Sequence, residues 1–322
     1  MNPLLSVCII TYNHEKYIVQ NVESILIQET NFEFEIVIGE DCSTDNTRDL
    51  LLDIKAKYTD KIKLLPSEKN IGAIPNFIKT LKACNSKYIA ICEGDDYWTD
   101  SNKLQKQVDF LESHREYSFC FHNAYVHDED INKEYLFNDD KGAFFKKNLN
   151  SDRVVEGWEL INEWICPTAS IVFRNNYDID YDLFEKTKYG DIVLILSLAR
   201  QGKVFYFNQV FSGYRKLLTG QRKAYSYDLP GKIAHYELLI DNFKDIPYLE
   251  FVCSKLISAF AYSYTVTQLR KKGIKGFKKN ISLFNKYFVN VLKLKSPVNK
   301  MWFLFYIFYE NVRITVKTII NF

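Results

Sequence analysis

The first 120 residues alternate short apolar runs with segments whose apolar side chains recur every three or four positions. The runs of strand length are Leu5–Thr11, Glu35–Gly39, Ile62–Leu65 and Tyr88–Cys92. Helical spacing is found in Glu15–Ile27, Thr47–Tyr58, Asn76–Ala83 and Asn102–Ser113. This alternation of strand and helix predicts a parallel sheet covered by helices.

The second part of the chain is less regular. From about Val126 to Gly157 polar residues dominate, and we interpret this stretch as a surface excursion. A strand is predicted at Thr168–Arg174, a helix at Asp191–Gln201, and two further strands at Val204–Asn208 and Val210–Tyr214. These elements extend the α/β pattern to about residue 225.

Beyond Tyr225 the turn residues become rare and the apolar spacing is helical. We therefore expect two domains, an α/β domain over residues 1–225 and a helical region over residues 226–322. Met301–Tyr309 is almost entirely apolar, but Glu310 and Arg313 interrupt it before the ~18–20 residues that a bilayer span needs. Such a segment is better suited to lie in a membrane interface than to cross one.

The overall charge excludes one class of partner. A formal net charge of +2 on 322 residues is too small for the basic surface that nucleic acid binding requires. Lys and aromatic residues are nevertheless mixed between Lys271 and Lys300. This mixture predicts peripheral contact with an anionic membrane surface. A helical subdomain that packs on the first domain, or a homodimer contact, is the alternative.

The cysteines indicate the compartment. There are seven, an odd number, scattered along the chain without a Cys-x-x-Cys pair. This pattern predicts buried free thiols in a reducing cytosol. The N-terminus has no basic leader and no cleavage site, so we expect no signal peptide and a cytoplasmic location.

An acidic cluster, Glu93-Gly94-Asp95-Asp96, follows the predicted strand Tyr88–Cys92 directly. Clustered carboxylates repel one another unless a cation neutralises them, and oxygen ligands suit Mg²⁺ or Mn²⁺. The cluster therefore predicts a hard metal bound together with phosphate. An acidic turn that only caps the next helix is the alternative. His122 and His127 lack a third ligand nearby, so zinc is not expected.

Two other strand ends carry candidate nucleotide-binding residues. Asp41 can accept the imide hydrogen of a uracil ring, although the residues after it can also simply cap a helix. After the first strand, Tyr12 can stack on a base while Thr11 and Asn13 bond to it. The glycines of a dinucleotide-binding loop are absent here, which excludes a Rossmann dehydrogenase.

Taken together, Ser6–Asn13, Val37–Thr47 and Glu93–Trp98 resemble the inverting family-two glycosyltransferases of the GT-A fold, over roughly residues 4–220. The resemblance implies an α/β fold with a Rossmann-like, mostly parallel sheet, while the C-terminal helical appendage is expected from the spacing of apolar residues alone. It also implies a nucleoside diphosphate sugar as donor and a divalent metal, Mn²⁺ or Mg²⁺, as cofactor.

The resemblance also assigns roles to individual residues. It implies that Thr11, Tyr12 and Asp41 bind the base and ribose and that Asn70 and Gly72 belong to the third donor loop. Asp95 would approach the ribose or donor phosphate, Asp96 with Asp95 would hold the metal, and Asp191 would be the general base. Trp98 is a candidate platform for a sugar ring, and Arg215 for a phosphate contact. Asp191 as a simple helix cap is the alternative. One departure concerns Leu217, which stands where family members often have a histidine that helps bind metal or pyrophosphate.

The expected function is the inverting transfer of a sugar from a nucleoside diphosphate sugar to a hydroxyl of a glycan or lipid-linked acceptor, in cell-surface polysaccharide synthesis. UDP is the expected carrier because Asp41 suits a uracil imide. A non-catalytic relative that binds a nucleotide sugar or glycan is the alternative. A nucleotidyltransferase is disfavoured because residues 10–16 lack the Gly-rich loop with Arg and Lys of that class.

Overall fold

The computed structural model describes residues 3–129, 131–139, 149–162, 164–217, 228–258 and 260. The chain forms two compact units, residues 1–219 and residues 220–322. Within the first unit the described strands join in one sheet of order β3-β2-β1-β4-β9-β6-β10-β5, with β7 paired to β6 and β8 to β10. The strands are β1 (Leu5–Thr11), β2 (Phe34–Glu40), β3 (Ile62–Pro66), β4 (Tyr88–Ile91), β5 (Tyr97–Trp98), β6 (Tyr117–Asp128), β7 (Lys133–Leu136), β8 (Arg153–Val155), β9 (Val172–Arg174) and β10 (Lys203–Lys216).

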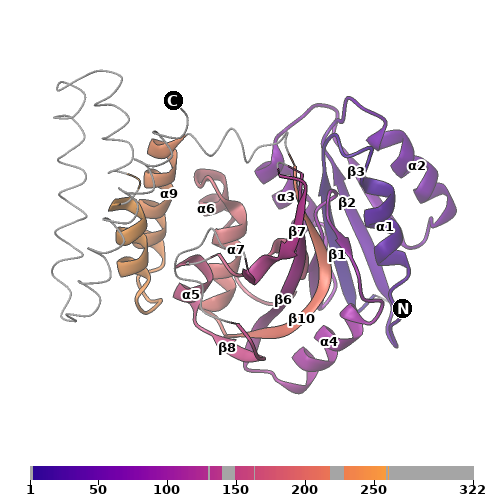
Figure 1. Ribbon diagram of the computed structural model, residues 1–322. Coiled ribbons are helices and arrows are strands. Elements are labelled where there is room, and N and C mark those ends of the chain that lie inside the picture. Colours follow the sequence, from indigo (N-terminus) through magenta and orange to yellow (C-terminus); the bar gives the residue numbers. More distant parts are fainter. Residues whose placement is uncertain are drawn as a thin grey trace. The chain divides into compact units, whose positions relative to one another are not determined.

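Helices cover both faces of this sheet, with α1, α2 and α4 on one side and α3, α6 and α7 on the other (Figure 1). Every second side chain of β1, namely Leu5, Val7 and Ile9, points to the same face of the sheet. These side chains are fully buried beneath α1. The helices are α1 (Ile18–Leu26), α2 (Thr47–Lys57), α3 (Ala73–Lys82), α4 (Lys103–Ser113), α5 (Gly157–Asn162), α6 (Tyr181–Lys186) and α7 (Gly190–Ala199). Short 3-10 turns lie at Phe137–Asp139 and Thr168–Ser170.

Strand direction determines where a ligand can bind. β1 is parallel to β2 and β4, and β2 is parallel to β3. β9 is antiparallel to both β4 and β6, so β6 and its parallel neighbour β10 run in the same direction as β1. The carboxyl ends of β1, β2, β4, β6 and β10 therefore meet at one edge of the sheet, which is where open α/β sheets bind ligands.

The predicted elements of the first 120 residues are confirmed, with shifts of a few residues at their ends. Helix α1 begins at Ile18 rather than Glu15, because residues 12–17 form a loop at the ligand edge. The sheet also contains antiparallel strands, since β5, β7, β8 and β9 are antiparallel to their neighbours.

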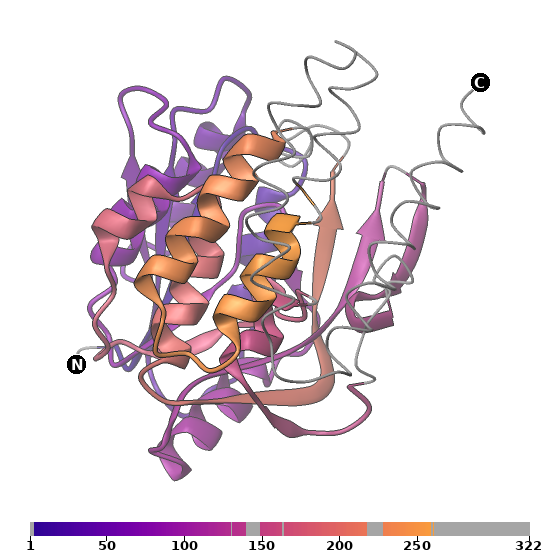
Figure 2. The ribbon, with the colours of Figure 1, turned by 90° about the vertical axis from the view of Figure 1, so that its left-hand side faces the viewer.

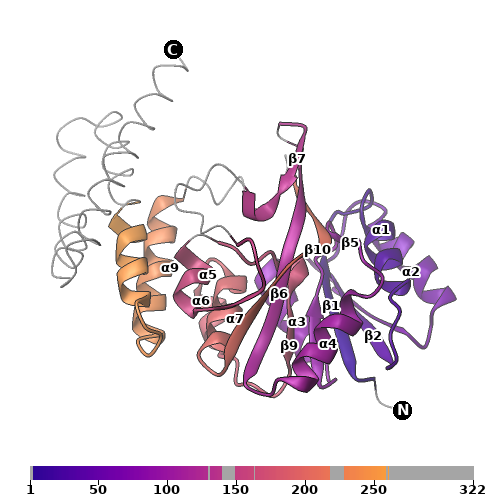
Figure 3. The ribbon, with the colours of Figure 1, turned by 60° about the horizontal axis from the view of Figure 1, so that its bottom comes forward.

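The sequence analysis predicted no strand at residues 117–128, and the stretch 126–157, interpreted as a surface excursion, contains the short strands β7 and β8. Strand β6 runs from Tyr117 to Asp128 in the middle of the sheet, and the β6–β7 hairpin extends beyond the sheet edge (Figure 3). Its pattern was hidden because the strand is buried on both faces, polar residues such as His122 and Asn123 included. The strands predicted at 204–208 and 210–214 are one strand, β10, with a register shift between Phe207 and Val210.

The described part of the second unit is mainly helical. Helix α9 (Leu229–Asn242) begins where the Asp228 side chain accepts a hydrogen bond from the Gly231 amide at 3.0 Å. Residues 249–258 are also helical and lie beside α9, with Tyr236 stacked on Phe260 (Figure 2). Across the described residues, no helix combines the length and the apolar character that crossing a bilayer requires. Met301–Tyr309 lies outside the described residues.

All seven cysteines are free thiols, as predicted. Six of them are buried, and Cys42 is half-buried in the loop that follows β2.

Replacing Gly39 with alanine is expected to destabilise the first unit. A Cβ at Gly39 would lie 1.9 Å from Thr80 Oγ1 and 2.7 Å from Asn76 Oδ1, so α3 would have to move away from β2. Such overpacking typically costs ~1–3 kcal/mol in the free energy of unfolding, which urea denaturation measures.

The double variant Gly39→Ala/Thr80→Ala should recover part of that loss, because it removes the closest atom. Leu52→Ala, at an exposed position of α2, is the control and should change stability by no more than ~0.5 kcal/mol. If Gly39→Ala were as stable as the wild type, α3 would not pack on β2 as described.

Candidate active site

The loops after β1 and β2 are bonded to each other. The Asn13 side-chain oxygen accepts the Thr44 amide at 2.8 Å, and Ser43 Oγ accepts the Asn13 amide at 3.0 Å. Thr11 is buried between them, whereas Tyr12 is 40% exposed. The two loops thus form one surface from which the Tyr12 ring can contact a base, while the Asn13 side chain is occupied in holding the loops together.

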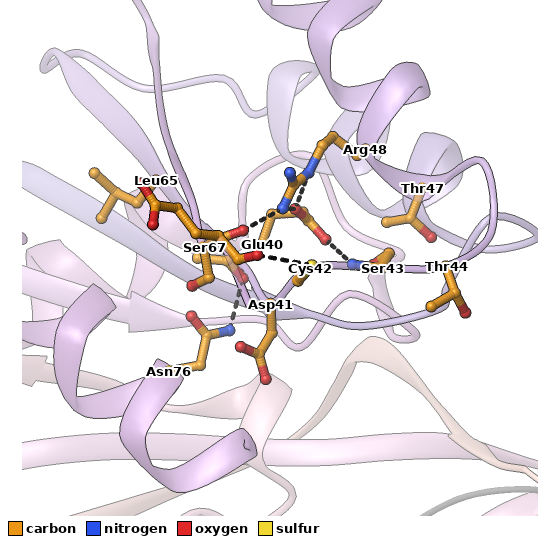
Figure 4. Close-up of polar contacts among 12 residues, drawn as sticks. Glu40, Asp41, Cys42, Ser43, Thr44, Thr47, Arg48, Leu65, Ser67 and Asn76 are labelled. Atoms are coloured by element: carbon orange, nitrogen blue, oxygen red, sulfur yellow. Dashed lines mark hydrogen bonds and ion pairs between the residues drawn. The ribbon is translucent and has the colours of Figure 1, made fainter. Parts of the chain in front are cut away.

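An ion pair between the buried Glu40 and the partly exposed Arg48 supports the second loop (Figure 4). Glu40, the last residue of β2, is fully buried and accepts the Ser43 amide at 2.6 Å. Its other oxygen pairs with Arg48, which also donates to the Ser67 carbonyl at 2.6 Å. Because the charge is paired and each oxygen is bonded, the burial is tolerated. The sequence analysis missed this pair, although an acidic residue ending an apolar strand with Arg eight positions later is a usable signal.

Asp41 connects the second loop to the third. Its two carboxylate oxygens accept the backbone amides of Ile71 at 2.8 Å and Gly72 at 2.9 Å. Asn70 also bonds the Gly72 amide, and Gly72 adopts a φ of 91° that favours glycine. Asp41, Asn70 and Gly72 therefore lie together. A nucleobase that bonds Asp41 must use the remaining lone pairs of an already bonded carboxylate.

The acidic turn after β4 is held by a residue from α1. Asn21, fully buried, donates from its side chain to the carbonyls of Glu93 at 2.8 Å and Asp96 at 2.9 Å. A Cβ at Gly94 would lie 2.7 Å from Thr11 Oγ1, so glycine allows the turn to approach the first loop. Asn21 was not predicted as a site residue. Its signal is a polar residue on the face of α1 that is otherwise formed mainly by Ile18, Val22 and Ile25.

Asp96 is buried in this turn with incomplete hydrogen bonding. Its Oδ1 accepts the Arg215 amide at 2.8 Å, while Oδ2 has no hydrogen-bond partner among the described residues. Burial, reinforced by the charges of Asp95 and Glu93, raises the pKa of Asp96 well above its usual value. Burial, together with the charges of Asp95 and Asp191, raises the pKa of Glu93 to about 8. Negative charge is unfavourable here unless a cation approaches.

These features fit a divalent cation. The unpaired, buried oxygen of Asp96 is a suitable ligand atom, and Asp95 beside it is half-buried. Within the described residues no group of three or more His, Cys, Asp or Glu side chains is arranged to hold a metal. One or two carboxylates suffice for Mg²⁺ when substrate phosphates and water complete its coordination.

Arg215, from the end of β10, brings positive charge to the acidic turn. Its guanidinium donates to the Asp95 carbonyl and to the Gln20 side chain. It also lies 4.6 Å from the centre of the Tyr97 ring and 4.9 Å from that of Tyr17. The structure thus places the predicted phosphate contact beside Asp95 and Asp96.

Asp191 lies at the start of α7 and is half-buried. Its Oδ1 accepts the Ile192 amide at 2.9 Å, and burial raises its pKa to about 6. Its charge contributes to the raised pKa of Glu93, so the two carboxyl groups interact across the site. A carboxylate of this kind is suited to take up a proton near neutral pH.

Trp98 is a core residue, so its prediction as a sugar platform was wrong. It is 3% exposed, its indole donates to the Ala169 carbonyl at 3.0 Å, and the Lys103 ammonium lies 4.1 Å from its ring centre. Successive side chains of a strand point to opposite faces. In β5 it is therefore Tyr97, which the sequence analysis missed, that points toward the site.

Comparison with known proteins identifies the family of this chain. Residues 6–182 match the family described as Glycosyl transferase family 2. The chain belongs to glycosyl transferase family 2. An uncharacterised protein of Mycobacterium tuberculosis is 31% identical over 245 residues, which are 74% of this chain and 68% of that protein. A Bacillus subtilis member named for teichuronic acid biosynthesis, TuaG, is 38% identical over 109 residues, 34% of this chain and 42% of that one.

Solved structures show the same fold, which confirms the expected GT-A architecture of this family 2 chain. Residues 1–349 of Staphylococcus aureus TarS, in complex with UDP-GlcNAc, superpose with a TM-score of 0.59 at 17% identity, covering 88% of this chain and 80% of that one. The mannosyltransferase PcManGT from Pyrobaculum calidifontis, with GDP-Man and Mn²⁺, gives 0.54 at 14% identity, covering 97% and 87%.

Replacing Asp41 with asparagine is expected to loosen the third loop of this family 2 site. Asparagine keeps one acceptor but turns an N–H₂ group toward one of the two amides that Asp41 binds. Loss of a charge-assisted bond, ~1.5–3 kcal/mol, should speed hydrogen exchange of the Ile71 and Gly72 amides by ~10- to 100-fold. Asn70→Ala, which removes one neutral bond, should have a smaller effect. Unchanged exchange in Asp41→Asn would contradict the described connection.

Proposed function

We propose that the chain is an inverting, divalent-metal-dependent glycosyltransferase that uses a nucleoside diphosphate sugar as donor. The main support is a single observation, the unpaired buried oxygen of Asp96 in an acidic turn that Arg215 adjoins. The acidic turn and the Arg215 guanidinium lie together at the carboxyl edge of the sheet, where a diphosphate and its cation can bind.

The nucleoside is proposed to lie against the bonded loops after β1 and β2. Tyr12 is sufficiently exposed to stack on a base, and Asp41 retains lone pairs for an imide hydrogen, which favours uracil. The TarS structure contains UDP-GlcNAc and the PcManGT structure GDP-Man, so both carriers occur on this fold. We propose UDP for this chain on the basis of Asp41.

The diphosphate is proposed to lie between the acidic turn and Arg215. Asp96, with Asp95, would hold Mn²⁺ or Mg²⁺, which supplies neutralisation of the negative charge on the departing diphosphate. Arg215 offers guanidinium N–H donors to phosphate oxygens from the other side. Asn21 keeps the turn in place through the carbonyls of Glu93 and Asp96.

The chemical step is proposed to be one in-line displacement. Asp191 accepts the proton of an acceptor hydroxyl whose oxygen forms the new bond to the anomeric carbon. The bond from that carbon to the diphosphate oxygen breaks, and the nucleoside diphosphate leaves with the electron pair. The anomeric configuration inverts because attack and departure occur on opposite faces.

The acceptor is proposed to be a growing glycan or a lipid-linked glycan in cell-surface polysaccharide synthesis. The names of relatives point this way, since TuaG is named for teichuronic acid biosynthesis. We propose a cytoplasmic location at the inner membrane face, based on the free thiols and on the Lys and aromatic mixture of residues 226–322. A homodimer contact is the alternative role of that region.

Asp191→Asn is expected to reduce kcat by ~10²–10⁴ while leaving donor affinity nearly unchanged, because only the proton acceptor is lost. Steady-state kinetics and calorimetric titration with the UDP sugar that the wild type turns over separate the two quantities. Asp182→Asn, at the start of α6, is a matched control that should retain activity. Equal kcat for the wild type and Asp191→Asn would exclude this role.

The pH dependence of activity provides a second test of the role of Asp191. Only its ionised form can accept a proton, and burial raises its pKa to about 6. The wild-type kcat/KM should therefore be retained above that pH and fall as the pH drops through about 6. The residual activity of Asp191→Asn should lack this part of the profile.

Asp96→Asn should abolish the stimulation of nucleotide binding by metal. The variant keeps an acceptor for the Arg215 amide but removes the charge proposed to hold the cation. Titration with UDP, with and without Mn²⁺, should show enhancement in the wild type and in the control Asp109→Asn, an exposed carboxylate on α4, but not in Asp96→Asn. Binding of UDP and UDP sugars without turnover on any acceptor would instead support the non-catalytic relative.

A further inference from the structure

Arg215 is held between two aromatic rings that come from distant parts of the chain. Tyr17 precedes α1 and Tyr97 belongs to β5, and the guanidinium carbon lies 4.9 Å and 4.6 Å from their ring centres. Contact with aromatic faces is favourable for a guanidinium and restricts the rotamers of its side chain. Arg215 is thus fixed in position more firmly than an arginine at a sheet edge normally is.

The position of Tyr97 depends on a glycine of β10. Gly213 lies directly opposite Tyr97 in the antiparallel pair of β10 and β5. A Cβ at Gly213 would lie 2.4 Å from Cε1 and Cζ of Tyr97. Only glycine therefore allows the Tyr97 ring to lie across the strand beside Arg215.

A hydrogen-bonded chain then fixes the Tyr97 hydroxyl. It lies 2.7 Å from Nε2 of His127, and Nδ1 of His127 lies 2.6 Å from Oε1 of Glu134. His127 is the direct neighbour of Arg215 between β6 and β10, and of Glu134 between β6 and β7. Glu134, His127 and Tyr97 thus connect three strands. The last member of this hydrogen-bonded series, Tyr97, carries the ring that contacts the Arg215 guanidinium.

The hydrogen bonds that join Glu134, His127 and Tyr97 contribute little to the stability of the core. The Glu134 side chain is 71% exposed and that of His127 is 28% exposed, and ion pairs of this kind stabilise a fold by only ~0–1 kcal/mol. Their removal should leave folding nearly unchanged. These hydrogen bonds instead fix the Tyr97 ring against Arg215. Arg215 has five N–H donors, and its contacts to Asp95 and Gln20 account for two of them.

We propose that Tyr97, His127 and Glu134 are positioning residues that hold Arg215 ready for the diphosphate of the donor. This inference rests on the proposed function and extends it to residues with no direct part in the chemistry. The three side chains act through Arg215, so they should affect the affinity for diphosphate and not for the nucleoside or its first phosphate.

The test compares UDP with UMP by calorimetric titration in the presence of Mn²⁺. In Tyr97→Phe and His127→Ala the affinity for UDP should fall roughly three- to tenfold, the usual effect of losing one hydrogen bond, while that for UMP stays unchanged. His127→Gln, which can still bond the Tyr97 hydroxyl, should restore part of the UDP affinity. Tyr58→Phe, a half-exposed tyrosine after α2, is the control and should match the wild type.

Each outcome decides the inference. Wild-type affinity for UDP in both variants, or an equal loss for UDP and UMP, would overturn it while leaving the proposed function intact. If the wild type bound neither UDP nor GDP with Mn²⁺ or Mg²⁺, the proposed function would fail, and this inference with it. If thermal unfolding showed His127→Ala to be unfolded, Glu134→Gln, at an exposed position, gives the same comparison.

Discussion

The structure depends on a concentration of negative charge at one edge of the sheet. Asp96 is buried with one oxygen unpaired among the described residues, and Glu93 and Asp95 lie in the same turn. Burial opposes the ionised form of Asp96, and the neighbouring charges add to that effect. The pKa of Asp96 is accordingly raised well above its usual value. Such a site is favourable only when a cation is near, and Arg215 supplies part of that charge from within the chain.

The surrounding fold holds this turn in place from several directions. Asn21 of α1 bonds two of its carbonyls, and Gly94 lets it approach the loop after β1. Because β9 is antiparallel to both β4 and β6, β6 and β10 run in the same direction as β4. Their carboxyl ends therefore lie at the same edge of the sheet as the acidic turn. Sequence-distant groups, Asp96 and Arg215, are therefore within hydrogen-bond distance. The stabilising contacts are mostly bonds to backbone groups, which suits a site that must be rigid before its ligand arrives.

Much of the first half of the fold could be predicted because its strands are apolar and its helices amphipathic. The motifs around Asp41 and Asp96 could be found because each follows a predicted strand, whereas the role of Asp191 came only from the resemblance to the glycosyltransferase family. Strand β6 could not, because His122 and Asn123 are buried in it and break the apolar pattern. Trp98 was misassigned since composition does not tell which face of a two-residue strand is buried. Asn21 and His127 act through contacts with residues far along the chain, which spacing alone does not reveal.

The most direct test of the central claim is a crystal structure of the protein with UDP and Mn²⁺. The account predicts the diphosphate between Arg215 and the turn of Asp95 and Asp96, with the cation bound to Asp96 and the uracil beside Tyr12 and Asp41. A nucleotide bound away from this edge, or a diphosphate that contacts neither Arg215 nor the acidic turn, would contradict it.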